Sequence, residues 1–192
     1  MGTALATISG FARTDLTSEQ KVYPIPFTSC KVWDAPTTNL PAAAATDDAA
    51  LVVGTPGTNA LTIQGLDPGG TTTASKFTFE FALPPEYDSA GSAAIRVKGK
   101  CTTSIADNSC TIDFNVYRDV RDGTVGADLM ASAAFSINNT TAVSSDMSIT
   151  ASSLGPGDKI IVVGTIAGID VANAAAIVPT ILALEMVLAV KG

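Results

Sequence analysis

The sequence has 192 residues, a formal net charge of −7, 46% hydrophobic residues and 15% charged residues. A chain of this length can bury about two-thirds of its unfolded surface around one core, so it needs no metal or disulfide to fold. The acidic balance lacks the basic surface that nucleic-acid binding requires, and the absence of histidine excludes Ser-His-Asp and Cys-His catalysis and every histidine-containing zinc site.

The first part of the chain, residues 1–70, has the composition of an arm or a loop-rich segment. Prolines and glycines recur at short intervals, and the apolar runs at 51–53 and 61–63 are short. This segment has too few long apolar side chains to fold alone. We therefore expect it to lie along the rest of the protein or on another subunit, and we divide the chain into residues 1–70 and a β-sandwich domain of residues 71–192.

Strand signals with a period of two begin after residue 71. Aromatic residues occupy one face of residues 77–83, and apolar residues occupy one face of 95–101 and of 110–116. The polar stretch "TSIADNS" separates the last two, which predicts a long hairpin. In that hairpin Arg96 and Lys98 would form cross-strand ion pairs with Asp113.

Shorter strand signals follow the stretch "RDVRDGTVGAD", which is typical of a loop. They cover residues 131–137, 143–149 and 159–166. Between the last two lies "SLGPGDK", in which a proline with a fixed φ stands between two permissive glycines and predicts a turn.

The last run, "IVPTILALEMVLAVKG" at residues 177–192, is largely apolar at both its odd and its even positions. A membrane-spanning helix needs about 20 apolar residues, and Pro179 and Glu185 interrupt this run. A buried helix remains an alternative, because leucine, alanine and methionine favour helices. We expect a central strand that is covered on both faces.

These elements predict an all-β fold. Seven strand candidates in residues 71–192 and one in residues 1–70 make a two-sheet antiparallel sandwich of eight strands, with an extended N-terminal arm. A jelly roll is the topology we expect, and an immunoglobulin-like sandwich remains the alternative.

Cysteines are few and widely spaced, at Cys30, Cys101 and Cys110. Their odd number and spacing fit neither a disulfide framework nor a C-x-x-C metal site, so we expect free thiols. A bridge between Cys101 and Cys110 across the expected hairpin is the alternative. The N-terminus has no basic residue before Arg13 and no long apolar core, so we expect no signal peptide and synthesis inside a cell.

A possible metal site is the cluster Asp119, Asp122 and Asp128, in a loop with two glycines. Carboxylates are ligands that Ca²⁺ prefers, but the spacing does not fit an EF-hand loop. The alternative is a solvated turn in which aspartate and glycine shape the backbone. We expect no cofactor.

Catalysis without histidine would rest on paired carboxylates, as in glycoside hydrolases. The candidates are spread singly along the sequence, and Trp33 is the one tryptophan in the chain. We therefore expect no enzymatic activity. The candidate carboxylates are Glu80, Glu86, Asp88, Asp113 and Glu185.

Charge is nearly absent between residues 124 and 154, where Asp128 and Asp146 are the only charged side chains. Burying such a surface against a neighbouring subunit costs little free energy of desolvation. A structural or interaction role is therefore favoured over catalysis.

The phrases "WDAPTTNLPAAAATDDAALVVGTPGT", "FALPPEYDSAGSAAIRVKGK", "TIDFNVYRDVRDGTVGADL" and "LALEMVLAVKG", in this order, resemble a group of tailed-bacteriophage virion proteins of the head-decoration or cement type. The resemblance covers about residues 30 to 192. It implies a jelly-roll cement protein on the capsid surface, made in the host cytoplasm. It implies as partners the major capsid protein and copies of the chain itself, often as a homotrimer on a threefold axis. From the acidic charge balance and the interrupted apolar run we expect no partner among nucleic acids or membranes, and the resemblance assigns no functional residue.

Two functions remain open. The first is a structural protein that clamps capsid subunits, with residues 1 to 50 as the arm that reaches a neighbour. The second is a receptor- or glycan-binding module of a head fibre or tail, which would use loops at one end of the sandwich. Tyr87 and Tyr117 are the candidate stacking rings for such loops, and their small number favours the first function.

Overall fold

The structure is a computed structural model that describes residues 18–55, 58–103, 109–120, 124–170 and 176–191. Its regular elements are strands, apart from the short 3-10 turns η2 (Phe27–Ser29) and η3 (Ala151–Ser153). The strands are β1 (Ser18–Pro24), β2 (Ala50–Val52), β3 (Thr62–Gln64), β4 (Thr72–Ala82), β5 (Ala93–Cys101), β6 (Ser109–Asp119), β7 (Val125–Asp128), β8 (Phe135–Ser136), β9 (Val143–Ile149), β10 (Lys159–Ile169) and β11 (Pro179–Lys191).

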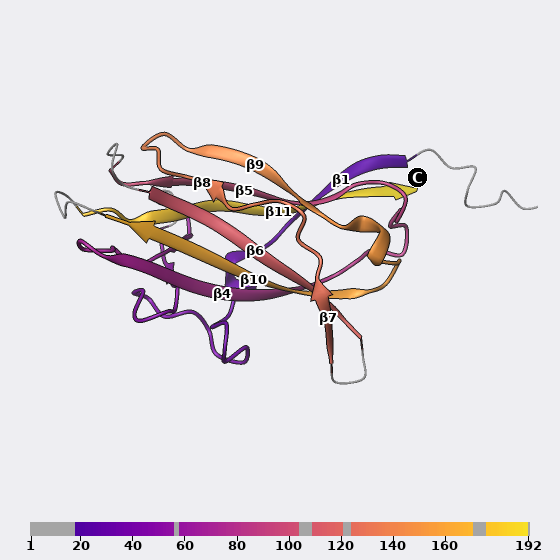
Figure 1. The fold of residues 1–192 in the computed structure, drawn as a ribbon, viewed down its shortest axis with the longest axis horizontal. Helices are drawn as coiled ribbons and strands as arrows, with labels where there is room; N and C mark the ends of the chain where they lie inside the picture. Colours follow the sequence, from indigo (N-terminus) through magenta and orange to yellow (C-terminus); the bar gives the residue numbers. More distant parts are fainter. Residues whose placement is uncertain (1–17, 56–57, 104–108, 121–123, 171–175, 192) are drawn as a thin grey trace, which may run out of the picture.

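The strands form two antiparallel sheets that face each other, and Figure 1 shows them as two layers. The first sheet has the order β2-β3-β11-β5-β9, with β1 also beside β11, and the second has the order β4-β10-β6-β7, with β8 beside β6. Along the chain from β3 to β6, and again from β8 to β11, each step crosses to the other sheet. Two sheets connected in this order make a jelly roll. The predicted two-sheet sandwich is confirmed, and the strand order identifies its topology.

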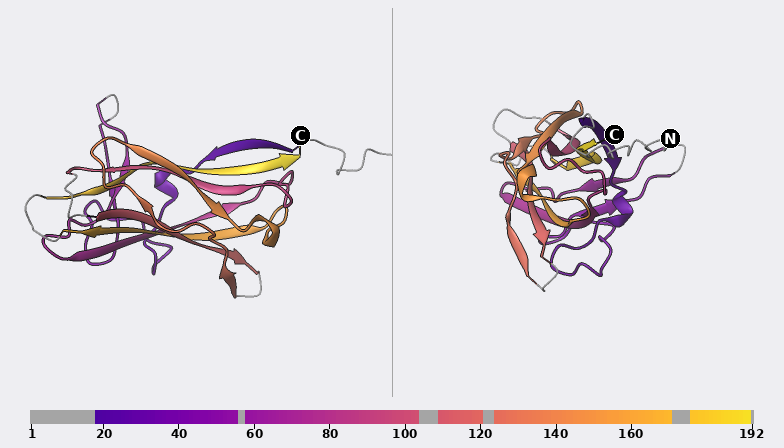
Figure 2. Two further views of the ribbon diagram at one scale, coloured as in Figure 1. Left: turned by 45° about the horizontal axis from the view of Figure 1, so that its top comes forward. Right: turned by 90° about the vertical axis from the view of Figure 1, so that its right-hand side faces the viewer.

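The last strand, β11, lies in the interior of its sheet. It pairs with β5 on one side, and with β3 and then β1 on the other. Figure 2 shows β1 and the end of β11 side by side. The expectation of a central strand is therefore confirmed, and both helical alternatives are wrong. A β-bulge between Ile181 and Ala183 shifts the register, and Leu182 is partly exposed although the strand was expected to be covered on both faces.

The space between the sheets is filled mainly by large apolar side chains. The ring of Phe77 meets the ring of Phe114 edge to face, with 6.4 Å between their centroids. On the neighbouring strand, a Cβ at Gly164 would lie 2.3 Å from the ring of Phe77. A glycine is therefore required on β10 at the point where this ring packs.

The expected hairpin between 95–101 and 110–116 is wrong, because β5 and β6 belong to different sheets. Both strands do bury the predicted faces. However, alternation shows only that each strand has one buried face. Two such strands can bury these faces either side by side in one sheet or face to face in two sheets. The expected ion pairs with Asp113 are wrong for the same reason. Arg96 bonds Asp146 of β9 instead, at 2.7 Å and 2.9 Å.

Two other expectations fail in the region after β6. The stretch interpreted as a loop contains β7, which pairs with β6 and so extends the second sheet. The strand expected over 131–137 is reduced to the two residues of β8. The short alanine and serine side chains of 131–134 offer little apolar surface with which to hold a longer strand.

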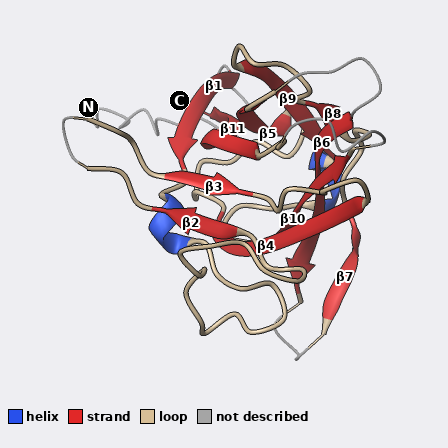
Figure 3. Ribbon diagram, turned by 90° about the vertical axis from the view of Figure 1, so that its left-hand side faces the viewer, coloured by secondary structure: helices blue, strands red, loops and turns tan. Residues whose placement is uncertain are grey.

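The N-terminal segment is joined to both sheets over its described part, from residue 18 onward. Besides β1 beside β11, it supplies β2 and β3, which form from the two short apolar runs. The side chains of Ile25, Phe27 and Val32 are buried in the core. Figure 3 shows η2 beside β2, with a long loop beyond it near β4. The division of the chain at residue 70 stays a prediction.

We expect Leu184→Asp to accumulate as insoluble protein. Leu184 is 2% exposed on β11, so the substitution removes a core side chain and buries a charge that has no partner, at a cost of about 4 kcal/mol or more. The matched control is Leu182→Asp, two residues away on the same strand and partly exposed, which should stay soluble. Fractionation after expression, followed by circular dichroism of the soluble protein, measures this. A soluble Leu184→Asp variant with a native spectrum would contradict the assignment.

Candidate functional site

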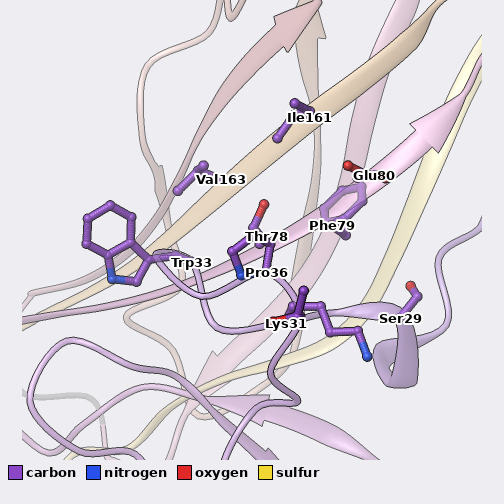
Figure 4. A pocket seen from close by; sticks show the side chains of 10 residues that line it. Ser29, Lys31, Trp33, Pro36, Thr78, Phe79, Glu80, Ile161 and Val163 are labelled. Carbon is purple, nitrogen blue, oxygen red and sulfur yellow. The ribbon is translucent and has the colours of Figure 1, made fainter. Parts of the chain in front are cut away.

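A cavity of about 580 Å³ lies on the outer face of the second sheet, where the segment after η2 passes over β4 and β10. Figure 4 shows side chains from both parts of the chain around it. The lining residues are Ser29, Lys31, Trp33, Pro36, Thr37, Thr78, Phe79, Glu80, Ile161 and Val163. Its size lies within the range of small-molecule pockets.

The loop that walls the cavity is held by backbone hydrogen bonds to the free edge of β4. Lys31 and Thr78 exchange two bonds, at 2.8 Å and 2.9 Å, and Ala49 N donates to Lys76 O at 2.9 Å. The buried side chains of Val32 and Leu40 fix the loop from below. A sheet edge that is otherwise open to pairing is thereby covered, and the cavity wall becomes part of the folded structure.

The indole of Trp33 is fixed by two interactions. Its Nε1 donates to Asp47 Oδ2 at 3.0 Å, and the Lys76 ammonium lies 4.2 Å from the ring centroid in a cation–π contact. The chain itself therefore sets the position of the ring before any ligand arrives.

The floor and the rim of the cavity differ in polarity. Ile161 and Val163 of β10 supply partly exposed apolar side chains to the floor. At the rim, Lys31 Nζ bonds Asn39 Oδ1, and Glu80 accepts from Lys159 Nζ at 3.1 Å. One cation and one carboxylate thus face the cavity, each held by a neighbour.

The two tyrosines considered as stacking rings have different positions. Tyr87 is buried, its hydroxyl donates to Ala151 O at 3.2 Å, and burial raises its pKa to about 12. It is therefore a core residue. Tyr117 lies directly opposite Ile161 in the sheet, so its side chain shares the outer face with the cavity floor.

The candidate catalytic carboxylates are not gathered in the cavity, where Glu80 is the one carboxylate among the described lining residues. Asp113 lies on β6, separated from β4 by β10, and Glu185 lies in the other sheet, within 3.8 Å of Arg96. Asp88 bonds the amide of Ala90 and, at 3.5 Å, Lys191. Glu86 belongs to the turn before β5, where its carbonyl accepts from Lys191 N. Four of these five candidate carboxylates therefore lie outside the cavity lining.

The proposed calcium ligands are described in part. Asp119 lies 3.0 Å from Lys159 Nζ, whereas Asp128 accepts hydrogen bonds from Asn115 Nδ2 and from the amides of Val116 and Met130. Asp122 lies outside the described residues. No group of three potential ligands occurs within the described ranges. The calcium site stays a prediction.

All three cysteines are free thiols, as the sequence predicted, and all three are buried. Burial raises the pKa of Cys30 and of Cys110 to about 12. Cys101 and Cys110 lie at the adjoining ends of β5 and β6, close enough for their thiols to interact, but they are not bridged. Thiols in this state are poor nucleophiles and metal ligands.

The low-charge stretch lies at the edges of both sheets, and we call its described residues, from 124 to 154, the low-charge edge. It contains β7 and β8 at one edge of the second sheet and β9 at the edge of the first. Ala131 N donates to Ser148 O at 2.9 Å and Thr150 N to Leu129 O at 2.8 Å, which joins the two edges. Its two carboxylates are bonded within the chain, Asp128 as described above and Asp146 to Arg96.

Comparison with known proteins assigns no family. No family model matches the chain, and no curated protein matches it. Among solved structures, it is similar to the CBM36-1 domain of a multidomain xylanase from the hindgut metagenome of Trinervitermes trinervoides, with 9% identity and a TM-score of 0.41 over 88% of this chain and 96% of that one.

Two further solved structures are similar over smaller parts of their own chains. One is the arabinose-bound α-L-arabinofuranosidase MgGH51, with 15% identity and a TM-score of 0.43 over 88% of this chain and 26% of that one. The other is from infectious bursal disease virus, strain Gt, with 11% identity and a TM-score of 0.34 over 76% of this chain and 39% of that one. The jelly-roll assignment rests on the strand order alone.

No helix within the described ranges is long and apolar enough to cross a membrane. The cavity itself was missed from the sequence, because the segment that walls it was interpreted as an arm. The one available signal was Trp33, a large aromatic residue in a stretch otherwise rich in proline, alanine and threonine.

Asp128 provides a test of how β7 is held. Burial alone would raise the pKa of this carboxyl, but its hydrogen bonds to Met130 N, Asn115 and Val116 N outweigh burial and lower the pKa. These hydrogen bonds therefore stabilise the fold above about pH 4, which is the ordinary pKa of an aspartate in an unfolded chain. The stabilisation is lost as the pH falls through the lower pKa that Asp128 has in the folded chain.

We expect Asp128→Ala to lower the free energy of unfolding by about 1 kcal/mol at neutral pH. Asp128→Asn, which keeps the oxygen that accepts from Val116 and Met130, should cost less. Urea unfolding at pH 7 and pH 3 measures this, and the difference between wild type and Asp128→Ala should shrink at the lower pH. Equal losses for both variants at both pH values would contradict this role.

Proposed function

We propose that this protein is a non-enzymatic structural protein of a virion, which decorates and stabilises a bacteriophage capsid by binding the major capsid protein. The observation that carries the proposal is the low-charge edge. Desolvation is costly for free charges, and here both carboxylates of the surface are already bonded within the chain. A surface of this kind suits permanent contact with another protein.

The fold supports the same function. The described chain is held by one continuous core between two sheets, with three cysteines that are free and no disulfide among them. The apolar core, and not a disulfide among these cysteines, therefore holds the described chain together. The sequence phrases that resemble head-decoration proteins include the cavity loop with β2, the turn before β5 with most of β5, most of β6 with β7, and most of β11.

We expect the purified protein to be a trimer that associates through the low-charge edge. Ala134→Arg with Ser148→Arg adds two charges at exposed positions of this edge and should convert the trimer to monomer without changing the fold. Ser89→Arg, an exposed position outside the edge, is the control. Sedimentation equilibrium measures the mass. A monomeric wild type, or a trimer unaffected by the edge variant, would contradict this interface.

We expect attachment to capsids to require residues 2–17. The deletion ends before Ser18, because β1 pairs with β11 along its whole length and a longer deletion would remove buried side chains. The shortened protein should keep the wild-type circular dichroism spectrum and lose binding to empty capsids in a cosedimentation assay. Binding at wild-type occupancy would show that another surface makes the attachment.

Cryo-EM of intact particles tests the proposal as a whole. A decoration protein should appear in many copies over the capsid lattice, with the low-charge edge at contacts between its own copies. Density confined to a fibre or to the tail would overturn the capsid position and favour the receptor-binding alternative.

A further inference from the structure

We propose that the cavity beside Trp33 is a binding site for a neutral pyranose sugar, and that it takes the glycan without hydrolysing it. The inference is independent of capsid attachment. It rests on the walls of the cavity, on the charges at its rim and on its place in the sheet.

The walls suit the apolar face of a sugar ring. Ile161 and Val163 form an apolar floor, and the indole of Trp33 forms a side wall. A pyranose presents a face of C–H groups that packs against an aromatic ring in the same way as other apolar groups. Because Asp47 and Lys76 already hold the indole, binding costs little side-chain entropy at this wall.

The rim suits a ligand with many hydroxyl groups and no charge. Hydrogen-bond donors and acceptors surround the opening. They belong to the hydroxyl side chains of Ser29 and Thr37 and to the charged side chains of Lys31 and Glu80. Around the rim the two cations Lys31 and Lys159 are balanced by the carboxylates of Glu80 and Asp119, which both pair with Lys159. Neither an anion nor a cation is therefore favoured. A purely apolar ligand would remove these polar groups from water without replacing their hydrogen bonds, which is unfavourable.

The sheet extends the site beyond one ring. Glu80, Ile161 and Tyr117 lie opposite one another on adjacent strands, so a second aromatic ring stands on the same face next to the floor. A chain of two or three sugar units can therefore run from Trp33 toward Tyr117. Among the described lining residues Glu80 is the one carboxylate, and it is bonded to Lys159, so the site lacks the paired acid and base of a glycosidase.

The experiment uses the full chain and its single tryptophan as the reporter. Cellotriose, maltotriose and chitotriose are each titrated up to about 10 mM, and the emission of Trp33 is followed. We expect at least one trisaccharide to shift the emission with saturation, and the products after long incubation to show no cleavage. Hexaproline and a peptide of residues 1–17 are titrated in parallel as other occupants.

Variants locate the binding by calorimetry, which needs no tryptophan. Trp33→Ala should weaken binding about tenfold or more, and Val163→Arg should do the same by filling the cavity from β10. Tyr117→Ala should weaken binding of the trisaccharide more than binding of its monosaccharide. Val125→Ala, exposed at the low-charge edge, is the control with unchanged binding. Circular dichroism confirms that each variant is folded.

Several results would overturn the proposal. The first is that no trisaccharide gives a saturable response. The second is that Trp33→Ala and Val163→Arg, both folded, still bind the sugar as the wild type does. The third is that a peptide binds and no sugar does. The last result would assign the cavity to a protein segment instead. Cleavage of a bound sugar would overturn the claim that the site only binds.

Discussion

The burial of β11 between β5 and the pair β1 and β3 is the constraint on which the rest of the structure depends. Five core-facing side chains of this strand, at about 1.5–3 kcal/mol each, form a large share of the apolar surface removed from water. A slip of one residue would turn all of them out of the core, so the register is fixed on both sides. The core-facing side chains are Ile181, Leu184, Met186, Leu188 and Val190.

This constraint also places the N-terminal segment. With β5 on one side of β11, the other side would be an open edge if β1 and β3 did not cover it. Once β1 is held there, the chain leads through Ile25 and Phe27 into the core and on to the edge of β4. The wall of the cavity is therefore a consequence of closing the first sheet, although the cavity itself lies on the second.

Much of the fold could be predicted from the sequence because alternation reports directly which face of a strand is buried. It identified β4, β5 and β6 with their core faces, and it placed strands at β9, β10 and β11. It failed where the decision rests on contacts distant in sequence. Whether β5 and β6 pair or face each other depends on which partners complete each sheet, and the ion pair of Arg96 with Asp146 follows from that choice. The cavity could not be predicted for the same reason, because its wall forms only where Lys31 and Thr78, distant in sequence, meet in the folded chain.

The two surfaces to which we assign roles are separated by the order of the strands. In the second sheet, β4 and β10 carry the cavity at one side, and β7 forms the other edge after β6. A neighbour that binds the low-charge edge would therefore cover β7, β8 and β9 and leave the opening beside Trp33 in contact with solvent. The association of subunits and the binding of a sugar unit beside Trp33 need not compete. A unit at Tyr117 would lie next to the neighbour, because Tyr117 pairs with Asp128 of the low-charge edge. A fold with one continuous core can thus be held by one edge while it presents a separate face outward.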